Sequence, residues 1–125
     1  MEEKRKFTRI VCNMRAWVQL DDLIIVEANN LNISLKGAFF ELADYCVFEK
    51  GDKWQLTFIL PNSDIRLQFK TEVIHSTGNM VGVKFVHIET ETMIHLRRLI
   101  EIQTSNPEQV ERELELLHRL NQPSK

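Results

Sequence analysis

The stretch "IRLQFKTEV" at residues 65–73 decides the fold, because its side chains alternate between two faces along its whole length. One face is mainly apolar and the other is polar: the first carries Ile65, Leu67, Phe69, Thr71 and Val73, and the second carries Arg66, Gln68, Lys70 and Glu72. A period of two residues is typical of a β-strand with one face against a core. Turn-forming residues bound it, with "PNSD" before it and "STGN" after it.

The same pattern repeats on both sides of this strand. It predicts further strands at residues 10–20, 23–30, 38–42, 54–60 and 80–88. The polar stretch "NLNISLKG" at 30–37 favours local backbone hydrogen bonds, so we expect it to interrupt the sheet. Six short strands with turn-length connections indicate an antiparallel sheet, and closing that sheet removes its two exposed edges. The predicted fold is therefore mainly β, a six-stranded antiparallel β-barrel followed by C-terminal α-helices.

Helical periodicity begins after residue 88. Met93, Leu96 and Ile100 recur at helical spacing and predict a first helix. A second helix is expected at residues 107–120, and its start "SNPEQ" offers an N-cap asparagine, a proline in the first helical position and a capping-box glutamine. We therefore divide the chain into a flexible basic arm at 1–9, a barrel with its helix at 10–103, and a helical extension with a tail at 104–125.

Composition places the chain among ordinary globular proteins. It has 125 residues, of which 43% are hydrophobic and 27% charged, and its net charge is -2. This balance predicts no general attraction to nucleic acid polymers or to anionic membranes. The two cysteines, Cys12 and Cys46, lack a CxxC or histidine cluster, so we expect free thiols and no metal site. No signal peptide or membrane-length apolar run is evident, which predicts a cytoplasmic protein without membrane insertion.

Catalytic signatures are absent from the sequence. The four histidines, His75, His87, His95 and His118, belong to no metal or triad motif. Neither GxGxxG nor a P-loop occurs among the four glycines. We therefore predict no catalytic residues and no enzyme activity, and a hydrolase is disfavoured for want of any signature.

A two-part motif remains. Arg5-x-x-x-Arg9 is followed, after 22 intervening residues, by Asn32-x-Ser34-x-x-Gly37. That spacing is about one hairpin, which can carry the second segment back toward the first. Guanidinium forks match phosphate oxygens or the O6/N7 edge of guanine, and they also stack on purines. An asparagine amide can read a base edge, while a glycine permits positive φ or close approach of a ligand.

These segments, "RKFTR" and "NISLKG", resemble the PilZ domain family, whose signature is RxxxR followed by [D/N]xSxxG. The resemblance extends to the strand "VGVKFVHI" before a helix and covers residues 3 to about 103. It implies a bacterial six-stranded barrel that binds the second messenger cyclic di-GMP. Carried over by position, Arg5 and Arg9 are expected to clamp phosphates and guanine faces. Asn32, Ser34 and Gly37 are expected to hold a guanine on the barrel.

The resemblance also implies how such a receptor signals. The arm is expected to order around the ligand and so to change the surface that a protein partner meets. Lys4 precedes the first arginine. In the family the residue at this position influences how many ligands stack in the site, so a stoichiometry of one or of two stays open. We expect no further cofactor, and a monomer or a weak homodimer. The alternative is a PilZ-like adaptor between proteins that does not bind nucleotide. A barrel for single-stranded nucleic acid is disfavoured by the net charge.

Overall fold

The computed structural model describes residues 7–12, 14–19, 24–44, 48–60, 63–104 and 106–120. Within these ranges the strands are β1 (Ile10–Cys12), β2 (Ala16–Gln19), β3 (Ile25–Ile33), β4 (Gly37–Leu42), β5 (Lys53–Ile59), β6 (Arg66–Thr77) and β7 (Met80–His87). Two helices follow, α1 (Thr90–Thr104) and α2 (Pro107–Leu120). Neither of these helices is long and apolar enough to cross a bilayer.

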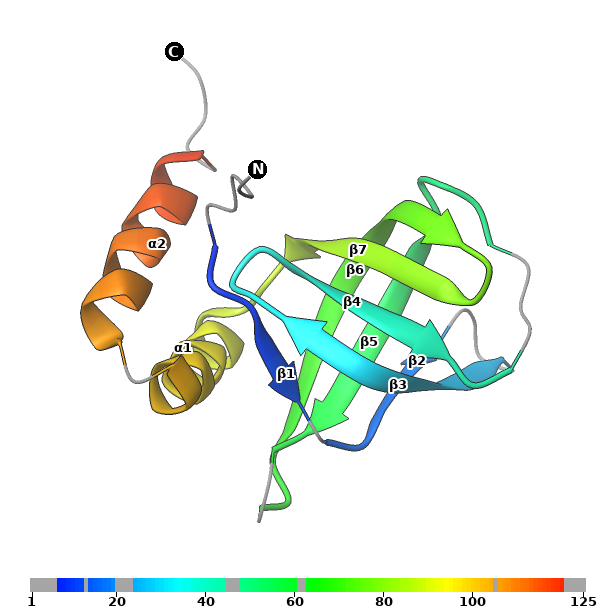
Figure 1. Ribbon diagram of the computed structural model, residues 1–125, viewed down its shortest axis with the longest axis horizontal. Helices are drawn as coiled ribbons and strands as arrows, with labels where there is room; N and C mark the ends of the chain where they lie inside the picture. Colours follow the sequence, from blue (N-terminus) through cyan, green and yellow to red (C-terminus); the bar gives the residue numbers. More distant parts are fainter. Residues whose placement is uncertain are drawn as a thin grey trace, which may run out of the picture.

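The sheet closes into a six-stranded barrel (Figure 1). Its strands follow the order β3-β2-β5-β6-β7-β4, and β4 pairs back with β3. Every pairing is antiparallel. The predicted barrel with C-terminal helices is thereby confirmed. Closure satisfies the backbone donors and acceptors that an open sheet leaves exposed.

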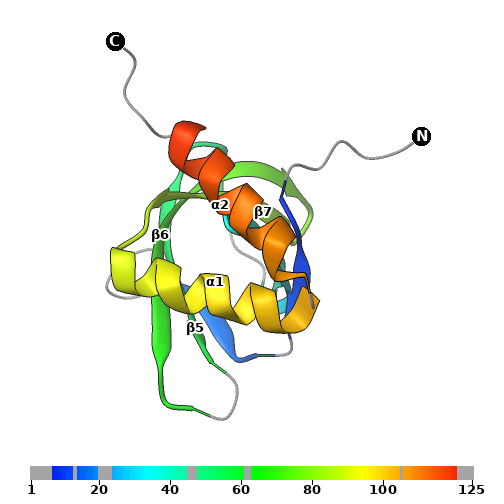
Figure 2. The same ribbon diagram turned by 90° about the vertical axis from the view of Figure 1, so that its left-hand side faces the viewer.

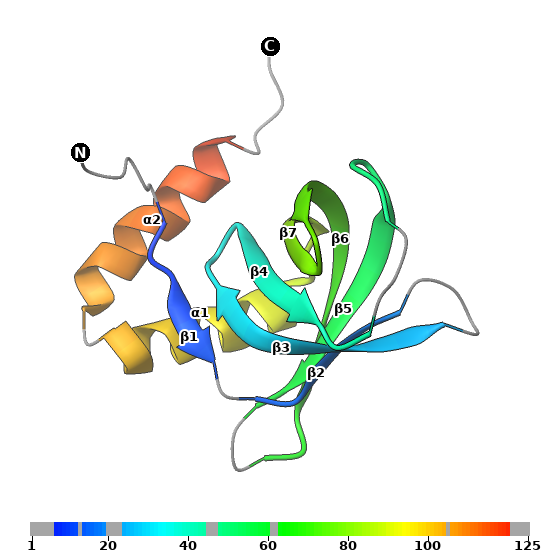
Figure 3. The same ribbon diagram turned by 45° about the vertical axis from the view of Figure 1, so that its right-hand side comes forward.

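The strand predicted at residues 10–20 is instead two strands that pair in succession with β3. Cys12 of β1 pairs with Leu31, and Ala16 of β2 pairs with Ala28. Four residues separate the first members of these pairs, but only three separate their partners on β3. β3 itself is bulged, because its register against β4 shifts near Asn30, which has a φ of 54°. A bulge bends its strand, and a straight eleven-residue neighbour cannot stay paired along it. The short β1 therefore runs between the helices and the barrel (Figure 3).

The predicted interruption at 30–37 is shorter than expected. β3 continues through Ile33 and β4 begins at Gly37, so three residues connect them. Asparagine-rich sequence disfavours a regular ladder, yet here the irregularity is absorbed by the bulge. This extension carries the second half of the two-part motif onto the barrel wall.

The barrel interior is filled by the apolar faces of the strands. Phe40, Phe58 and Phe69 are fully buried. The ring of Phe69 stacks on Phe58 at 5.4 Å and on Phe85 at 4.4 Å between centroids. Thr71 is also buried, and its hydroxyl donates to the carbonyl of Trp54 at 3.0 Å. Burial therefore follows the predicted alternation from Leu67 to Val73, whereas Ile65, expected on the same face, precedes β6 and is 43% exposed.

The helices cover one end of the barrel. Figure 2 shows α1 lying across that end, with α2 running obliquely above it from near the end of α1. Leu96 and Ile100 of α1 and Val110 and Leu117 of α2 are buried in the same core cluster as the strands. The apolar stripe of α2 is thus covered by its own chain.

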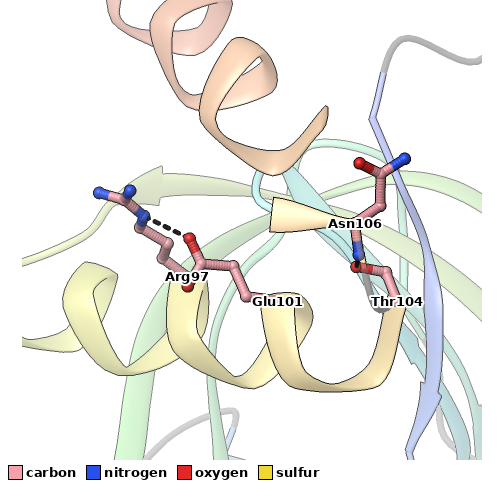
Figure 4. Close-up of polar contacts among 4 residues, drawn as sticks. All are labelled: Arg97, Glu101, Thr104 and Asn106. Atoms are coloured by element: carbon pink, nitrogen blue, oxygen red, sulfur yellow. Dashed lines mark hydrogen bonds and ion pairs between the residues drawn. The ribbon is translucent and has the colours of Figure 1, made fainter. Parts of the chain in front are cut away.

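The junction between the helices follows the expected capping chemistry (Figure 4). Asn106 Oδ1 accepts the backbone N–H of Gln109 at 3.3 Å, and the N–H of Asn106 donates to Thr104 Oγ1 at 3.3 Å. The capping box is incomplete, because the Gln109 side chain donates to Glu113 instead.

An ion pair joins two successive turns within α1. Arg97 Nε donates to Glu101 Oε2 at 2.8 Å, and this hydrogen bond raises the pKa of Arg97.

Candidate functional site

A cleft of about 510 Å³ lies where the β3–β4 turn and strands β6 and β7 meet the segment before β1. Its lining residues are Phe7, Arg9, Asn32, Ser34, Lys36, Gly37, Ala38, Phe39, Ile74, His75, Gly82, Val83 and Lys84. Four of the five predicted site residues, Arg9, Asn32, Ser34 and Gly37, are therefore brought together. Arg5 and Lys4 lie outside the described residues.

Strand pairing brings the two halves of the motif side by side. β1 pairs with the end of β3 through Ile10↔Ile33 and Val11↔Asn32. Arg9 directly precedes this paired stretch of β1, Ser34 directly follows that of β3, and both line the cleft. The 22 residues between Arg9 and Asn32 therefore bring the second half of the motif back beside the first, as the hairpin spacing predicted.

Asn32 stands on the outer face of the barrel wall. Its neighbours Leu31 and Ile33 are buried, so alternation turns the Asn32 side chain outward. Its Nδ2 donates to the carbonyl of Asn30 at 3.3 Å, at the bulge with positive φ. The bulge thus fixes the orientation of this amide at the mouth of the cleft.

Ser34 holds the β3–β4 turn together. Its N–H donates to the carbonyl of Gly37 at 2.9 Å, and its Oγ accepts the N–H groups of Lys36 at 3.2 Å and Gly37 at 3.3 Å. The residue is 8% exposed. The turn-forming role of serine is therefore directly visible, and it keeps Lys36 at the cleft.

Gly37 is required by the neighbouring strand. A Cβ at this position would lie 2.2 Å from the carbonyl oxygen of Val83 and 3.1 Å from the Cα of Lys84. Among the described glycines, positive φ occurs at Gly51 and Gly78 and not at Gly37. Of the two reasons expected for this glycine, positive φ is wrong, and the close approach is to the backbone of β7.

Several lining residues were not predicted from the sequence. Phe39, Ile74, His75 and Lys84 come from three different strands. The register of β6 against β7 shifts between Val73 and His75. Bulges re-aim side chains, and this one brings both Ile74 and His75 to the cleft although they are adjacent in sequence. No local motif marks these positions, because they become neighbours only through strand order.

The charge of the cleft is one-sided. Arg9, Lys36 and Lys84 are exposed cations along its lining, and no aspartate or glutamate occurs among the described lining residues. The whole chain, by contrast, has a net charge of -2. Phe39 and Ile74 add apolar surface between the charges. Such a lining suits an anion that also carries flat, weakly polar faces.

In the part of the chain that the structure describes, no three or more side chains of His, Cys, Asp or Glu gather closely enough to hold a metal ion.

The predicted arm is described only from Phe7 onward. Phe7 is 8% exposed and joins the core cluster. The ammonium of Lys36 lies 5.8 Å from the centroid of the Phe7 ring. Thr8 donates its N–H to Glu113 Oε1 at 2.8 Å. Phe7 and Thr8 are therefore packed between the cleft and α2, while Arg9 is exposed.

Comparison with known proteins gives the family. The model of the PilZ domain matches residues 3–101, a range that contains both halves of the motif. No curated protein matches the sequence.

Solved structures of similar fold accompany this match. The Bacillus subtilis inhibitor of motility MotI/DgrA superposes with a TM-score of 0.68 at 18% identity, covering 84% of this chain and 53% of that one. The PilZ domain of Escherichia coli YcgR with c-di-GMP gives 0.66 at 16% identity, covering 94% and 98%. YcgR from Escherichia coli in complex with c-di-GMP gives 0.64 at 18% identity, covering 88% and 50%. The chain thus spans about half the length of MotI and of the longer YcgR structure.

At these identities the superpositions show the fold alone, and they agree with the closed barrel. The family match runs through the barrel and most of α1. The chain therefore belongs to the PilZ domain family.

Proposed function

We propose that the chain is a non-catalytic receptor for cyclic di-GMP, which binds in the cleft beside the β3–β4 turn. One observation carries this proposal: four motif residues from two distant segments converge on a cleft with three cations and no described carboxylate. Family membership supports it, as do the YcgR structures that contain c-di-GMP.

The cleft offers a complementary group for each part of the ligand. Arg9 supplies a guanidinium fork for a phosphate or a guanine edge. Lys36 and Lys84 add positive charge at the rim, and Asn32 presents an amide to a base edge. Phe39 provides an apolar face against which a guanine can pack. Ser34 and Gly37 act mainly through the turn and the close β4–β7 approach that shape the ledge.

The N-terminal arm completes the site in this proposal. Arg5 lies outside the described residues, four positions before Arg9, and we assign it, with Arg9, to the clamp on phosphates and guanine faces. Ordering of the arm on binding costs conformational entropy, which the charged contacts offset. The ordered arm then alters the surface that a cytoplasmic protein partner meets.

Titration calorimetry of the purified protein with cyclic di-GMP tests the proposal. We expect saturable binding, and we expect Arg9→Ala to weaken it by about 1.5–3 kcal/mol because a charge-assisted contact is lost. Arg98→Ala is the matched control, since Arg98 is exposed on α1 and does not line the cleft. Absence of any heat or shift at high micromolar ligand would refute the receptor role. A partner captured equally without nucleotide would then favour the adaptor.

A further inference from the structure

Glu113 is a buried carboxylate on α2 that contacts Thr8, the residue before the second arginine of the RxxxR segment. It is 3% exposed, although glutamate is rarely buried without partners. Oε1 accepts the backbone N–H of Thr8 at 2.8 Å, and Oε2 accepts the hydroxyl of Thr8. Oε2 also accepts Nε2 of Gln109 at 3.0 Å. Both oxygens of this carboxylate are therefore engaged, and two of the three donors belong to Thr8.

These contacts join residues far apart in sequence. Thr8 and Glu113 are separated by 105 positions. Hydrogen bonds to an ionised acceptor are stronger than neutral ones, and a carboxylate withdrawn from water depends on them. The pair of bonds from one residue fixes both the backbone and the side chain of Thr8. The segment before β1 is thereby attached to α2.

The attachment determines where Arg9 stands. Arg9 follows Thr8 directly and precedes β1, whose pairing with β3 fixes the chain from Ile10 onward. Phe7, on the other side of Thr8, lies in the cleft lining with its ring under Lys36. With Thr8 held, the backbone on both sides of Arg9 is restrained at the edge of the cleft. A restrained group loses less entropy when it binds.

We propose that Glu113 is a positioning residue for the ligand clamp, so that α2 contributes to ligand binding. This inference rests on the proposed function. Glu113 does not line the cleft, and it acts through Thr8 on the placement of Arg9. Coupling of this kind is reciprocal, so ligand held by Arg9 also strengthens the docking of α2. Ligand binding in the cleft is thus transmitted to α2, whose exposed face carries Glu108, Glu111 and Glu115.

Calorimetry of full-length variants with cyclic di-GMP tests the proposal. Glu113→Leu keeps a buried apolar side chain on the helix but removes both acceptors, and we expect affinity to fall about tenfold. Glu113→Gln retains one carbonyl oxygen for the Thr8 N–H, and it should recover part of that loss. Glu115→Leu is the matched control on the exposed face of α2 and should bind within twofold of the wild type.

A double-mutant cycle separates positioning from a general structural effect. In the Arg9→Ala background, Glu113→Leu should change affinity less than twofold, because its influence passes through Arg9. An equal loss in both backgrounds would overturn the inference. Should Glu113→Leu fail to fold, Thr8→Val and Thr8→Ser decide: only Thr8→Val, which lacks the hydroxyl, should weaken binding.

The outcomes distinguish the two proposals. If wild-type protein binds but Glu113→Leu and Thr8→Val bind equally well, the positioning role is overturned and the receptor role stands. If wild-type protein does not bind, both are overturned. Hydrogen exchange of the Thr8 amide gives an independent reading, since its protection should be lost in Glu113→Leu while barrel amides stay protected.

Discussion

The two halves of the motif are held in the molecule by different means. The β3–β4 turn is tied by backbone hydrogen bonds, from Ser34 N–H to Gly37 and from Phe85 N–H to the carbonyl of Lys36 at 2.9 Å. The segment before β1 is held by the packing of Phe7 and by the bonds of Thr8 to Glu113. The turn is thus part of the barrel, while the clamp is attached by a few side chains. Substitutions in the turn should therefore change stability, and substitutions in the clamp should change affinity.

The largest effect is expected at Gly37. Gly37→Ala places a Cβ against the Val83 carbonyl, where β4 and β7 cannot separate without losing their pairing. We expect a loss of about 3 kcal/mol in the free energy of unfolding, at the upper end for overpacking. Urea denaturation followed by tryptophan fluorescence measures it. Gly82→Ala is the control, because its Cβ would meet its nearest neighbour at 3.4 Å.

Ser34→Ala comes next and tests the turn in the same way. The change leaves the N–H groups of Lys36 and Gly37 without their acceptor in a part-buried turn. We expect about 1–2 kcal/mol less stability, with a parallel loss of affinity as the ledge loosens. The same denaturation and calorimetry apply. Unchanged stability together with lost affinity would contradict the assignment of this serine to the scaffold.

Asn106→Ala probes the clamp from a distance. The side chain caps α2 through the N–H of Gln109, and its loss should cost about 1 kcal/mol. Because α2 carries Glu113, we expect Thr8 amide protection and ligand affinity to fall while the barrel amides are unaffected. Hydrogen exchange measures the protection of the Thr8 amide and of the barrel amides separately. Uniform loss of protection across barrel and helix would show that the regions are not separable.

Lys84→Met should have the smallest effect. It removes one exposed cation from the rim of the cleft and leaves the β7 pairing intact. We expect affinity to fall by about 0.5–1 kcal/mol and its salt dependence to weaken, with stability unchanged. Lys53→Met, an exposed lysine on β5 away from the cleft, is the control. Calorimetry at two salt concentrations measures both quantities.

The barrel was predictable because each strand carries its own signal. The alternation at 65–73 becomes the regular inward row of Leu67, Phe69 and Val73 in β6. The bulges were not predictable, since the split of residues 10–20 into β1 and β2 depends on how β3 bends. A bulge arises from the pairing of two strands, and neither strand encodes it alone.

The site was predictable in part for the same reason. Arg9 and Asn32 stand in a spaced motif, so sequence alone could single them out. His75 and Lys84 look like ordinary polar positions of strands until strand order places them around the cleft. The contact from Glu113 to Thr8 was equally hidden, because a carboxylate among many on a helix gives no sign of its partner.

Amide chemical-shift mapping during titration with cyclic di-GMP tests the central claim most directly. The account predicts that the largest shifts fall on Thr8, Arg9, Lys36 and Lys84, around the cleft. Residues of β5 that do not line the cleft, such as Lys53 and Gln55, should shift little. Shifts confined to that strand, or no shifts at saturating ligand, would contradict it.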